Sequence, residues 1–317
     1  MSADLTNPVF TDEAAAMAHL EESRWPNGEV SCPHCGSFKV HRMAGKTQAG
    51  MFLCNDCRDK FTARVGTVMG RSHVPVHKWL LAIHLLTSSK KGMSAHQLHR
   101  MLGVTYKTAW FMAHRIRAAM APAPDAGPIG GEGKIVEVDE TYHGNMDDKT
   151  KGKTTIRGKR GLGGKRPIVS LVERGGSVRS FYSGIATKAS VTEIVKGNIA
   201  RESRVFTDES RLYGEVKGHF GEHLTVHHSS GEYVRGEVHT NTIEGYFSVF
   251  KRGMKGIYQH CGEKHLHRYL AEFDFRYNYR TALGFNDTDR AAAALKGIEG
   301  KRLTYRRPDG SGLHLQS

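Results

Sequence analysis

The chain has 317 residues, of which 38% are hydrophobic and 9% aromatic, a composition typical of folded proteins rather than disordered ones. Lysine and arginine number 46 against 32 acidic residues, and the net charge of +14 predicts a polyanionic partner, with nucleic acid ahead of an anionic membrane. No apolar run approaches the ~18 residues of a membrane-spanning helix, and the N-terminus lacks a signal-peptide pattern, so we expect a cytoplasmic protein with no membrane partner and with reduced cysteines.

Two CxxC pairs follow a short Ala- and Glu-rich helix predicted near the N-terminus. They are Cys32 with Cys35, and Cys54 with Cys57. The 18 residues between the pairs are typical of a zinc ribbon, in which four thiolates surround Zn²⁺ tetrahedrally. Redox chemistry is disfavoured because the pairs are matched. Cysteine fills all four positions and leaves none for substrate, so we expect a structural zinc within a domain of residues 1–72.

Residues 73–121 predict a helix-turn-helix DNA-binding region. Ser94 can cap one helix, Gly103 permits a turn, and Thr105 can cap the next helix. Polar and basic side chains on this last helix suit base edges and phosphates. The expected DNA-binding residues are Lys107, Arg115 and Arg117.

A Pro- and Gly-rich linker, 122–133, precedes a change of pattern from helices to strands. Strands are predicted at 134–142, 166–173, 177–186, 203–210 and 223–228. Helices are predicted at 187–201, 241–255 and 263–280. We therefore expect an α/β domain over 134–282, in which one mixed sheet carries packed helices, and a C-terminal tail over 283–317.

The segment 149–166 between the first two predicted strands contains eight basic residues and no acidic one. It is Gly-rich and is expected to be a loop. A solvated linker and a contact with a phosphate backbone are both open interpretations.

Two aspartates stand where a buried charge needs a partner. Asp139 lies within one apolar predicted strand, and Asp208 ends another. Either one alone could be a strand-end residue that bonds its own backbone. If the strands are neighbours, however, the carboxylates converge and repel unless a divalent cation lies between them. Oxygen ligands of this kind suit Mg²⁺ or Mn²⁺.

A third acidic residue, Glu244, lies near the start of the predicted helix at 241–255. A lone glutamate there is usually a surface charge that complements the helix dipole. Lys251 lies about 20° from Glu244 around the helix, and about 80° from Asn241, whose carbonyl could also bind a hard cation. This spacing favours Glu244 as the third ligand and leaves Asn241 as the alternative. Lys251 and Arg252 are expected to contact DNA.

Two neighbouring glutamates are weaker candidates. Glu140 and Glu209 each stand beside one of the aspartates. Successive side chains of a strand point to opposite faces, so both glutamates are expected to point away from the aspartates, which is why they are the weaker candidates.

Together, Asp139, Asp208, Glu244 and Lys251 resemble the DDE signature of retroviral-integrase-type transposases, which have an RNase H-like fold. The stretches VDETYHG, VFTDES and HTNTIEGYFSVFKRG are more closely similar to ISXO-type insertion-sequence transposases of bacteria, which also carry a zinc ribbon and a DNA-binding helical region. The resemblance covers nearly the whole chain. It implies a nucleoid-associated DNA transposase that binds inverted-repeat ends, cleaves a phosphodiester and joins the 3′-OH to target DNA, using two Mg²⁺ or Mn²⁺ ions and acting as a homodimer or higher oligomer.

Two other functions stay open. A non-catalytic zinc-ribbon regulator with a degenerate nuclease fold is disfavoured by the intact Asp139, Asp208 and Glu244. A metal-dependent nuclease without strand transfer is barely separated from a transposase by sequence, and neither cut-and-paste nor replicative transposition is favoured.

Overall fold

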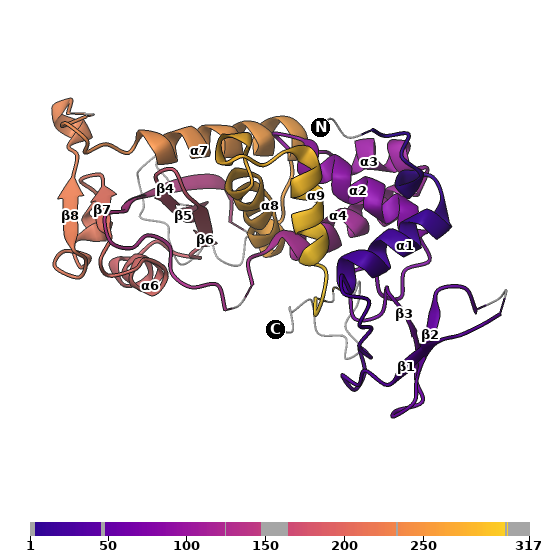
Figure 1. Ribbon diagram of the computed structural model, residues 1–317. Coiled ribbons are helices and arrows are strands. Elements are labelled where there is room, and N and C mark those ends of the chain that lie inside the picture. The colour runs from indigo at the N-terminus through magenta and orange to yellow at the C-terminus, as the bar shows by residue number, and fades with distance from the viewer. Residues whose placement is uncertain are drawn as a thin grey trace. The chain divides into compact units, whose positions relative to one another are not determined.

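The computed structural model describes residues 4–45, 48–123, 125–146, 164–232, 234–301 and 303 (Figure 1). They divide into two compact units, each of which is described by itself. The first contains the residues up to Ala121 and those from Phe285 onwards, and the second runs from Pro122 to Gly284. Within the described ranges no helix is both long and apolar enough to cross a bilayer.

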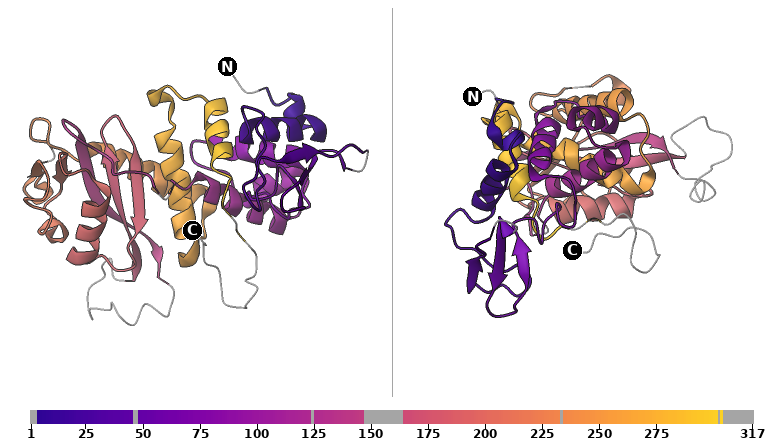
Figure 2. Two further views of the ribbon diagram at one scale, coloured as in Figure 1. Left: turned by 60° about the horizontal axis from the view of Figure 1, so that its bottom comes forward. Right: turned by 90° about the vertical axis from the view of Figure 1, so that its right-hand side faces the viewer.

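The first unit begins with helix α1 (Glu13–Arg24), which is capped by the side chain of Asp12. A three-stranded antiparallel sheet follows, made of β1 (Val40–Arg42), β2 (Met51–Cys54) and β3 (Lys60–Thr62) (Figure 2). The rings of Trp25, Phe52 and Phe61 pack together, with centroids 5.5–6.5 Å apart. An aromatic core of this size is too small to keep the three-stranded sheet folded by itself, so a bound metal ion is expected to stabilise it.

Three helices follow the small sheet: α2 (Val76–Ser88), α3 (Ala95–Leu102) and α4 (Tyr106–Met120). The predicted turn between the last two is confirmed. The side chain of Ser94 accepts the Gln97 N–H at the start of α3, and that of Thr105 accepts the Thr108 N–H at the start of α4. Gly103 ends α3 with φ of 59°, a left-handed conformation that glycine adopts without strain.

The C-terminal segment belongs to this first unit. Sequence reasoning placed 283–317 in a tail, but Asp287–Lys296 forms helix α9, which packs against α1, α2 and α4. Asn286 caps it, and Asp289 returns the bond in a capping box. Beyond α9, the Arg24 Nε donates to Glu299 Oε1 at 2.6 Å. The described part of the C-terminal segment is therefore built into the helical core.

The second unit is organised around a five-stranded mixed sheet. Its strands are β4 (Ile135–Asn145), β5 (Lys165–Glu173), β6 (Val178–Tyr182), β7 (Arg204–Thr207) and β8 (Glu222–Thr225). The spatial order is β6-β5-β4-β7-β8. Strand β5 pairs antiparallel with both β4 and β6, whereas β7 pairs parallel with both β4 and β8. This is the RNase H-like arrangement predicted from the sequence.

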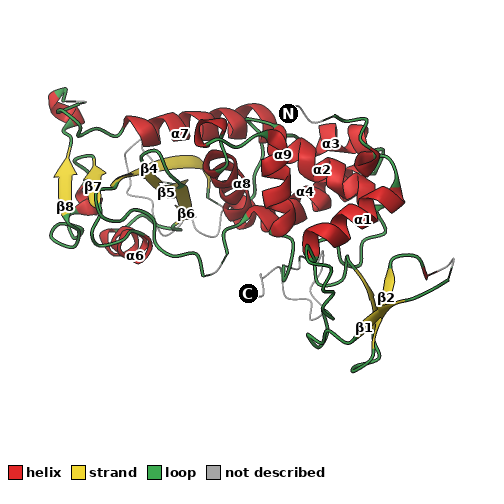
Figure 3. Ribbon diagram, viewed as in Figure 1, coloured by secondary structure: helices red, strands yellow, loops and turns green. Residues whose placement is uncertain are grey.

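Helices cover both faces of the sheet (Figures 1 and 3). Helix α6 (Lys188–Asn198) packs on one face, and α7 (Asn241–Gly253) and α8 (Leu266–Asn278) pack on the other. Side chains of β4 alternate between these two layers, so that Val136 and Val138 join the core beneath α6. The opposite face of β4 is turned towards α7, and it carries Glu137 and Asp139.

The basic segment 149–166 lies, up to residue 163, outside the described residues. Its contact with DNA therefore stays a prediction.

Close packing of the C-terminal segment on α4 can be tested at Gly297. A Cβ at this position would lie 2.1 Å from the Ala119 carbonyl oxygen, so Gly297→Ala should destabilise the protein by about 1–3 kcal/mol. Gly197→Ala in α6, where nothing lies within 4 Å, should instead stabilise it by about 0.5–1 kcal/mol. Chemical denaturation measures both changes. A Gly297→Ala variant as stable as the wild type would show that α9 does not pack on α4 in this way.

Candidate catalytic and metal-binding sites

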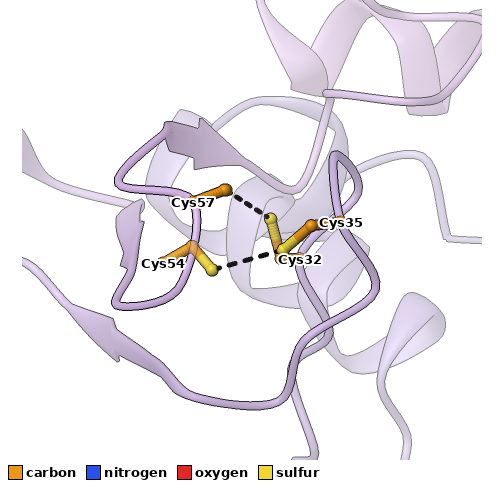
Figure 4. A group of neighbouring side chains, drawn as sticks. All are labelled: Cys32, Cys35, Cys54 and Cys57. Atoms are coloured by element: carbon orange, nitrogen blue, oxygen red, sulfur yellow. Dashed lines mark hydrogen bonds between the residues drawn. The ribbon is translucent and has the colours of Figure 1, made fainter.

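The four predicted zinc ligands converge in the ribbon (Figure 4). The Sγ atoms of Cys32 and Cys57 lie 3.7 Å apart, and those of Cys35 and Cys54 lie 3.6 Å apart. A tetrahedral zinc site with Zn–S bonds of ~2.3 Å has sulfur–sulfur edges of about 3.8 Å. The thiol positions therefore fit Zn²⁺.

Two matching turns bring the cysteines together. In the first, the Gly36 N–H donates to the Cys32 carbonyl at 2.8 Å; in the second, the Arg58 N–H donates to the Cys54 carbonyl at 3.0 Å. Both turn residues are left-handed, with φ of 76° at Gly36 and 64° at Arg58. A non-glycine residue in this conformation is uncommon, which indicates that the second turn is imposed by its surroundings.

The two predicted catalytic aspartates lie at the same level of the sheet. Parallel pairing places Glu137 of β4 opposite Phe206 of β7, so the register sets Asp139 opposite Asp208, immediately after the end of β7. Oxygens of Asp139, Asp208 and Glu140 lie within 4.8 Å of one another. The convergence inferred from sequence thus agrees with the geometry.

Glu244 of α7 lines the same pocket as this carboxylate group, although it is outside the set of oxygens that lie within 4.8 Å of one another. One pocket is lined by Asp139, Glu140, Thr141, Asp208, His228, Glu244, Phe247, Ser248, Lys251 and Arg252. The sequence-based alternative, Asn241, does not line the pocket and directs its backbone N–H to the His239 ring. The geometry therefore supports Glu244 over Asn241 as the third ligand, and it places Lys251 and Arg252 beside the carboxylates.

Glu140, one of the two weaker candidates from the sequence, lies with the two aspartates. β7 pairs with β4 only as far as Glu137, so beyond that point this edge of β4 is open and the Glu140 carboxylate reaches round it. The Tyr213 hydroxyl and the Ser210 hydroxyl donate to its two oxygens. Glu209, the other weak candidate, is exposed and accepts the Ser229 N–H instead.

The ionised forms of Asp139, Asp208 and Glu140 are disfavoured, first by burial and then by neighbouring carboxylates. Burial, and then the charges of Asp208 and Glu140, raise the pKa of Asp139 to about 8. Burial is also the main cause that raises the pKa values of Asp208 and Glu140. A divalent cation would remove this repulsion, and oxygen ligands of this type suit Mg²⁺ or Mn²⁺.

A further buried carboxylate, Glu137, escaped the sequence analysis. It is fully buried, two residues before Asp139, and its Oε1 accepts the Arg174 Nε–H at 2.6 Å. The sequence contains a signal for it, because Glu137 and Asp139 are both acidic residues inside one apolar strand. Only the fold shows that Arg174 pairs with Glu137.

Two of the predicted DNA-binding arginines lie in the interior. The guanidinium of Arg115 donates to the carbonyls of Val68, Gly70 and Leu303, and Arg117 is only 3% exposed. The prediction that Arg115 and Arg117 contact DNA is therefore wrong for this fold. The second half of α4 is buried within the structure, whereas Lys107 in its first turn is exposed.

Comparisons with known proteins agree with both sites. The ISXO2-like transposase domain matches residues 130–278, and the transposase zinc-ribbon domain matches residues 11–60. The chain is also 31% identical over 285 residues to an uncharacterized protein in transposable element ISH50 of Halobacterium salinarum, which covers 84% of this chain and 92% of the relative.

The chain belongs to the ISXO2-like transposase family. Within this transposase the four cysteines fall in the zinc-ribbon match, and the acidic residues of the pocket fall in the transposase-domain match. The helices α3 and α4 lie between the two matched regions, so the family assignment leaves the role of Lys107 to be argued from the structure.

The zinc assignment predicts that the purified transposase holds one Zn²⁺ per chain. Cys54→Ser should release the metal and unfold the ribbon, because the aromatic core there is small. Cys261→Ser, which alters a cysteine outside the group of four, should retain zinc. Elemental analysis measures the metal content and circular dichroism the folding. A zinc-free wild type, or a Cys54→Ser variant that keeps its zinc, would contradict the assignment.

The raised pKa of Asp139 predicts a stability that depends on pH. The folded protein disfavours the ionised carboxylate, so the penalty is absent below about pH 4 and grows as the pH rises to about 8. Without added divalent cation, Asp139→Asn should therefore raise the Tm at pH 8, by roughly 2–4 °C for each kcal/mol relieved, and change it little at pH 4.

Glu209→Gln is the control for this measurement, because Glu209 is exposed beside Asp208 and lies outside the acidic group. It should not raise the Tm at pH 8. Calorimetric scans at the two pH values that show the same Tm difference between Asp139→Asn and the wild type would refute the repulsion.

Proposed function

We propose that this transposase cleaves a phosphodiester at each end of its element and joins the resulting 3′-OH to target DNA. The observation that carries the proposal is a single pocket that combines Asp139, Asp208 and Glu244 with Lys251 and Arg252. Carboxylates supply ligands for hard cations, and the neighbouring basic side chains suit a phosphate backbone.

Divalent cations bound by the carboxylates would activate the attacking oxygen and stabilise the leaving one. The chain's own residues supply position and charge. Asp139 has oxygens within 4.8 Å of those of Asp208 and Glu140, and burial together with these neighbouring charges raises its pKa to about 8. Lys251 and Arg252, two turns along α7 from Glu244, would hold the DNA backbone so that its scissile phosphate faces the carboxylates.

We propose that the first unit recognises the inverted-repeat ends. The net charge of +14 favours DNA in general, and the corner formed by α3 and α4 offers a surface for reading it. Lys107 is exposed there, and Tyr106, 44% exposed, stacks on His96 with ring centroids 4.3 Å apart. Because two element ends must be joined in one event, we also propose that two or more chains assemble on DNA.

Two alternative functions make different predictions. A non-catalytic regulator has no use for carboxylates that repel one another in a pocket, so the raised pKa of Asp139 counts against it. A nuclease without strand transfer would use the same pocket. Only the appearance of joined product separates the nuclease from the transposase.

Strand cleavage and joining should depend on Glu244 rather than on Asn241. With a labelled element end, Mg²⁺ and a supercoiled plasmid, Glu244→Gln should lose cleaved and joined product by roughly 100-fold or more, because it keeps the shape of a ligand and removes its charge. Asn241→Ala should stay near the wild-type rate. Gel electrophoresis separates the two products. If Glu244→Gln joins strands normally and Asn241→Ala is inactive, Asn241 is the third ligand. If the wild type cleaves DNA without joining it, the nuclease is favoured over the transposase.

End binding should depend on Lys107 through its charge. Lys107→Ala should weaken binding to element ends and reduce the slope of log K against log salt by about 1. Arg115→Ala should instead lower the Tm, because Arg115 bonds three interior carbonyls. Fluorescence anisotropy over a salt series measures binding, with Lys196→Ala on α6 as the control. An unchanged salt slope in Lys107→Ala would refute this surface.

A further inference from the structure

The start of helix α7 is held by a buried acid from the neighbouring sheet. Glu137 of β4 is 0% exposed, and its Oε2 accepts the Ile243 N–H at 2.9 Å while its Oε1 accepts the Thr242 hydroxyl at 2.8 Å. The same Oε1 accepts the Arg174 Nε–H at 2.6 Å. We propose that the Glu137–Arg174 ion pair is a positioning device that fixes the first turn of α7, and with it Glu244, against Asp139.

Glu137 replaces the cap that a helix normally carries at its own N-terminus. The first N–H groups of a helix have no partner within it, and the N-cap side chain usually satisfies one of them. Here the N-cap residue Thr240 makes no such bond, and its hydroxyl donates to Glu244 Oε1 at 3.2 Å instead. A cap supplied by β4 joins the helix to the strand, which an internal cap cannot do.

Arg174 holds the chain on the other side of the same helix start. It follows β5, and its Nη1 donates to the Glu237 carbonyl at 2.8 Å while its Nη2 donates to the His239 carbonyl at 2.9 Å. The ion pair therefore binds the residues just before α7 as well as those in its first turn. Each charge also requires the other, because an unpaired buried Glu137 would be strongly destabilising.

Apolar packing alone would not set the position of Glu244. On the buried face of α7 the Tyr246 hydroxyl is hydrogen bonded to Ser180 and Asp274, beyond the first turn of the helix. The other buried side chains of this face, including Ile243, Phe247 and Phe250, pack on the sheet through apolar contacts that are not directional. Such contacts fix the distance of the helix from the sheet better than its position along its own axis. The hydrogen bonds to Glu137 fix that position at Ile243, the residue directly before Glu244.

The bond between Glu137 and Ile243 connects the strand that carries Asp139 to the helix that carries Glu244. Asp139 is two residues from Glu137 on the same face of β4, and Glu244 is one residue from Ile243, so the path between them is short and made of directional bonds. Displacements of about 1 Å cost catalytic sites roughly 100-fold. This inference rests on the proposed role of Glu244 as a ligand.

The experiment compares two buried ion pairs in the full chain. Glu137→Gln keeps the shape and one acceptor of Glu137 but removes its charge, and Glu272→Gln does the same to the Glu272–Arg276 pair of α8, whose side chains are 0% and 6% exposed. Hydrogen exchange of residues 241–246 reports the first turn of α7. Electron paramagnetic resonance of added Mn²⁺, without DNA, reports affinity for the metal.

We expect Glu137→Gln to speed exchange in 241–246 and to weaken Mn²⁺ binding by roughly 10–100-fold. Glu272→Gln should destabilise the fold without either effect. The double variant Glu137→Gln with Arg174→Gln should lose less than the sum of the two single variants, because the two residues are coupled, but more than Glu137→Gln alone, because the bonds of Arg174 to the Glu237 and His239 carbonyls are also removed. If Glu137→Gln fails to fold, Thr242→Val, which removes only one donor to Glu137, should give a smaller change in the same direction.

The proposal would be overturned if Glu137→Gln showed wild-type hydrogen exchange and wild-type Mn²⁺ affinity. It would also be overturned if Glu272→Gln changed both measurements as much as Glu137→Gln does, because the Glu137–Arg174 pair would then contribute only to general stability. A wild-type Mn²⁺ affinity in Glu244→Gln would instead refute the ligand role of Glu244 and the link to the metal. The exchange data would then still decide whether the ion pair holds α7.

Discussion

A carboxylate buried in a β-sheet is destabilising unless a cation or hydrogen-bond donors compensate it, and this constraint organises the catalytic unit. Strand β4 carries three acids within four residues, Glu137, Asp139 and Glu140. The three acids differ in the groups that compensate their charge. Arg174 compensates Glu137, and hydroxyl groups of Ser210 and Tyr213 compensate Glu140. Asp139, in contrast, lies within 4.8 Å of the acidic oxygens of Asp208 and Glu140.

Glu137 and Asp139 differ in their partners, and the difference indicates a structural role for Glu137 and a chemical role for Asp139. Glu137 has a cationic partner at 2.6 Å and two further donors from α7, so its charge stabilises the native arrangement without help from any ligand. Asp139 has a strongly raised pKa because it is buried beside Asp208 and Glu140. A site of that kind is destabilising in the free protein and becomes stable when a divalent cation binds, which is the behaviour expected of a metal-dependent enzyme.

Sequence reasoning succeeded where local spacing determines geometry. The two CxxC pairs define a zinc ribbon because each pair closes a tight turn, and Ser94, Gly103 and Thr105 mark helix ends through short-range bonds. Helical periodicity related Glu244 to Lys251 correctly, since both line the pocket. These inferences required no knowledge of distant parts of the chain.

The errors share one cause, which is packing between segments far apart in sequence. Glu140 reaches the site because β7 ends early and leaves an edge of β4 open, and strand alternation alone does not reveal this. Arg115 is interior because its guanidinium donates to carbonyl oxygens of residues far away in sequence, Val68, Gly70 and Leu303. From the sequence alone, a basic side chain on a helix suggests a DNA contact, because the segments that cover the helix are not known. Helix α9, which packs on α4, begins about 170 residues after Arg115.

The central claim is that the acidic group of β4 and β7 binds divalent cations, and Mn²⁺ titration followed by electron paramagnetic resonance tests it most directly. The zinc-loaded wild type and the control Glu209→Gln should bind Mn²⁺ saturably with equal affinity, while Asp139→Asn and Asp208→Asn should both lose this binding. Retention of wild-type Mn²⁺ binding in both aspartate variants would contradict the account, because the pocket would then be acidic without being a metal site.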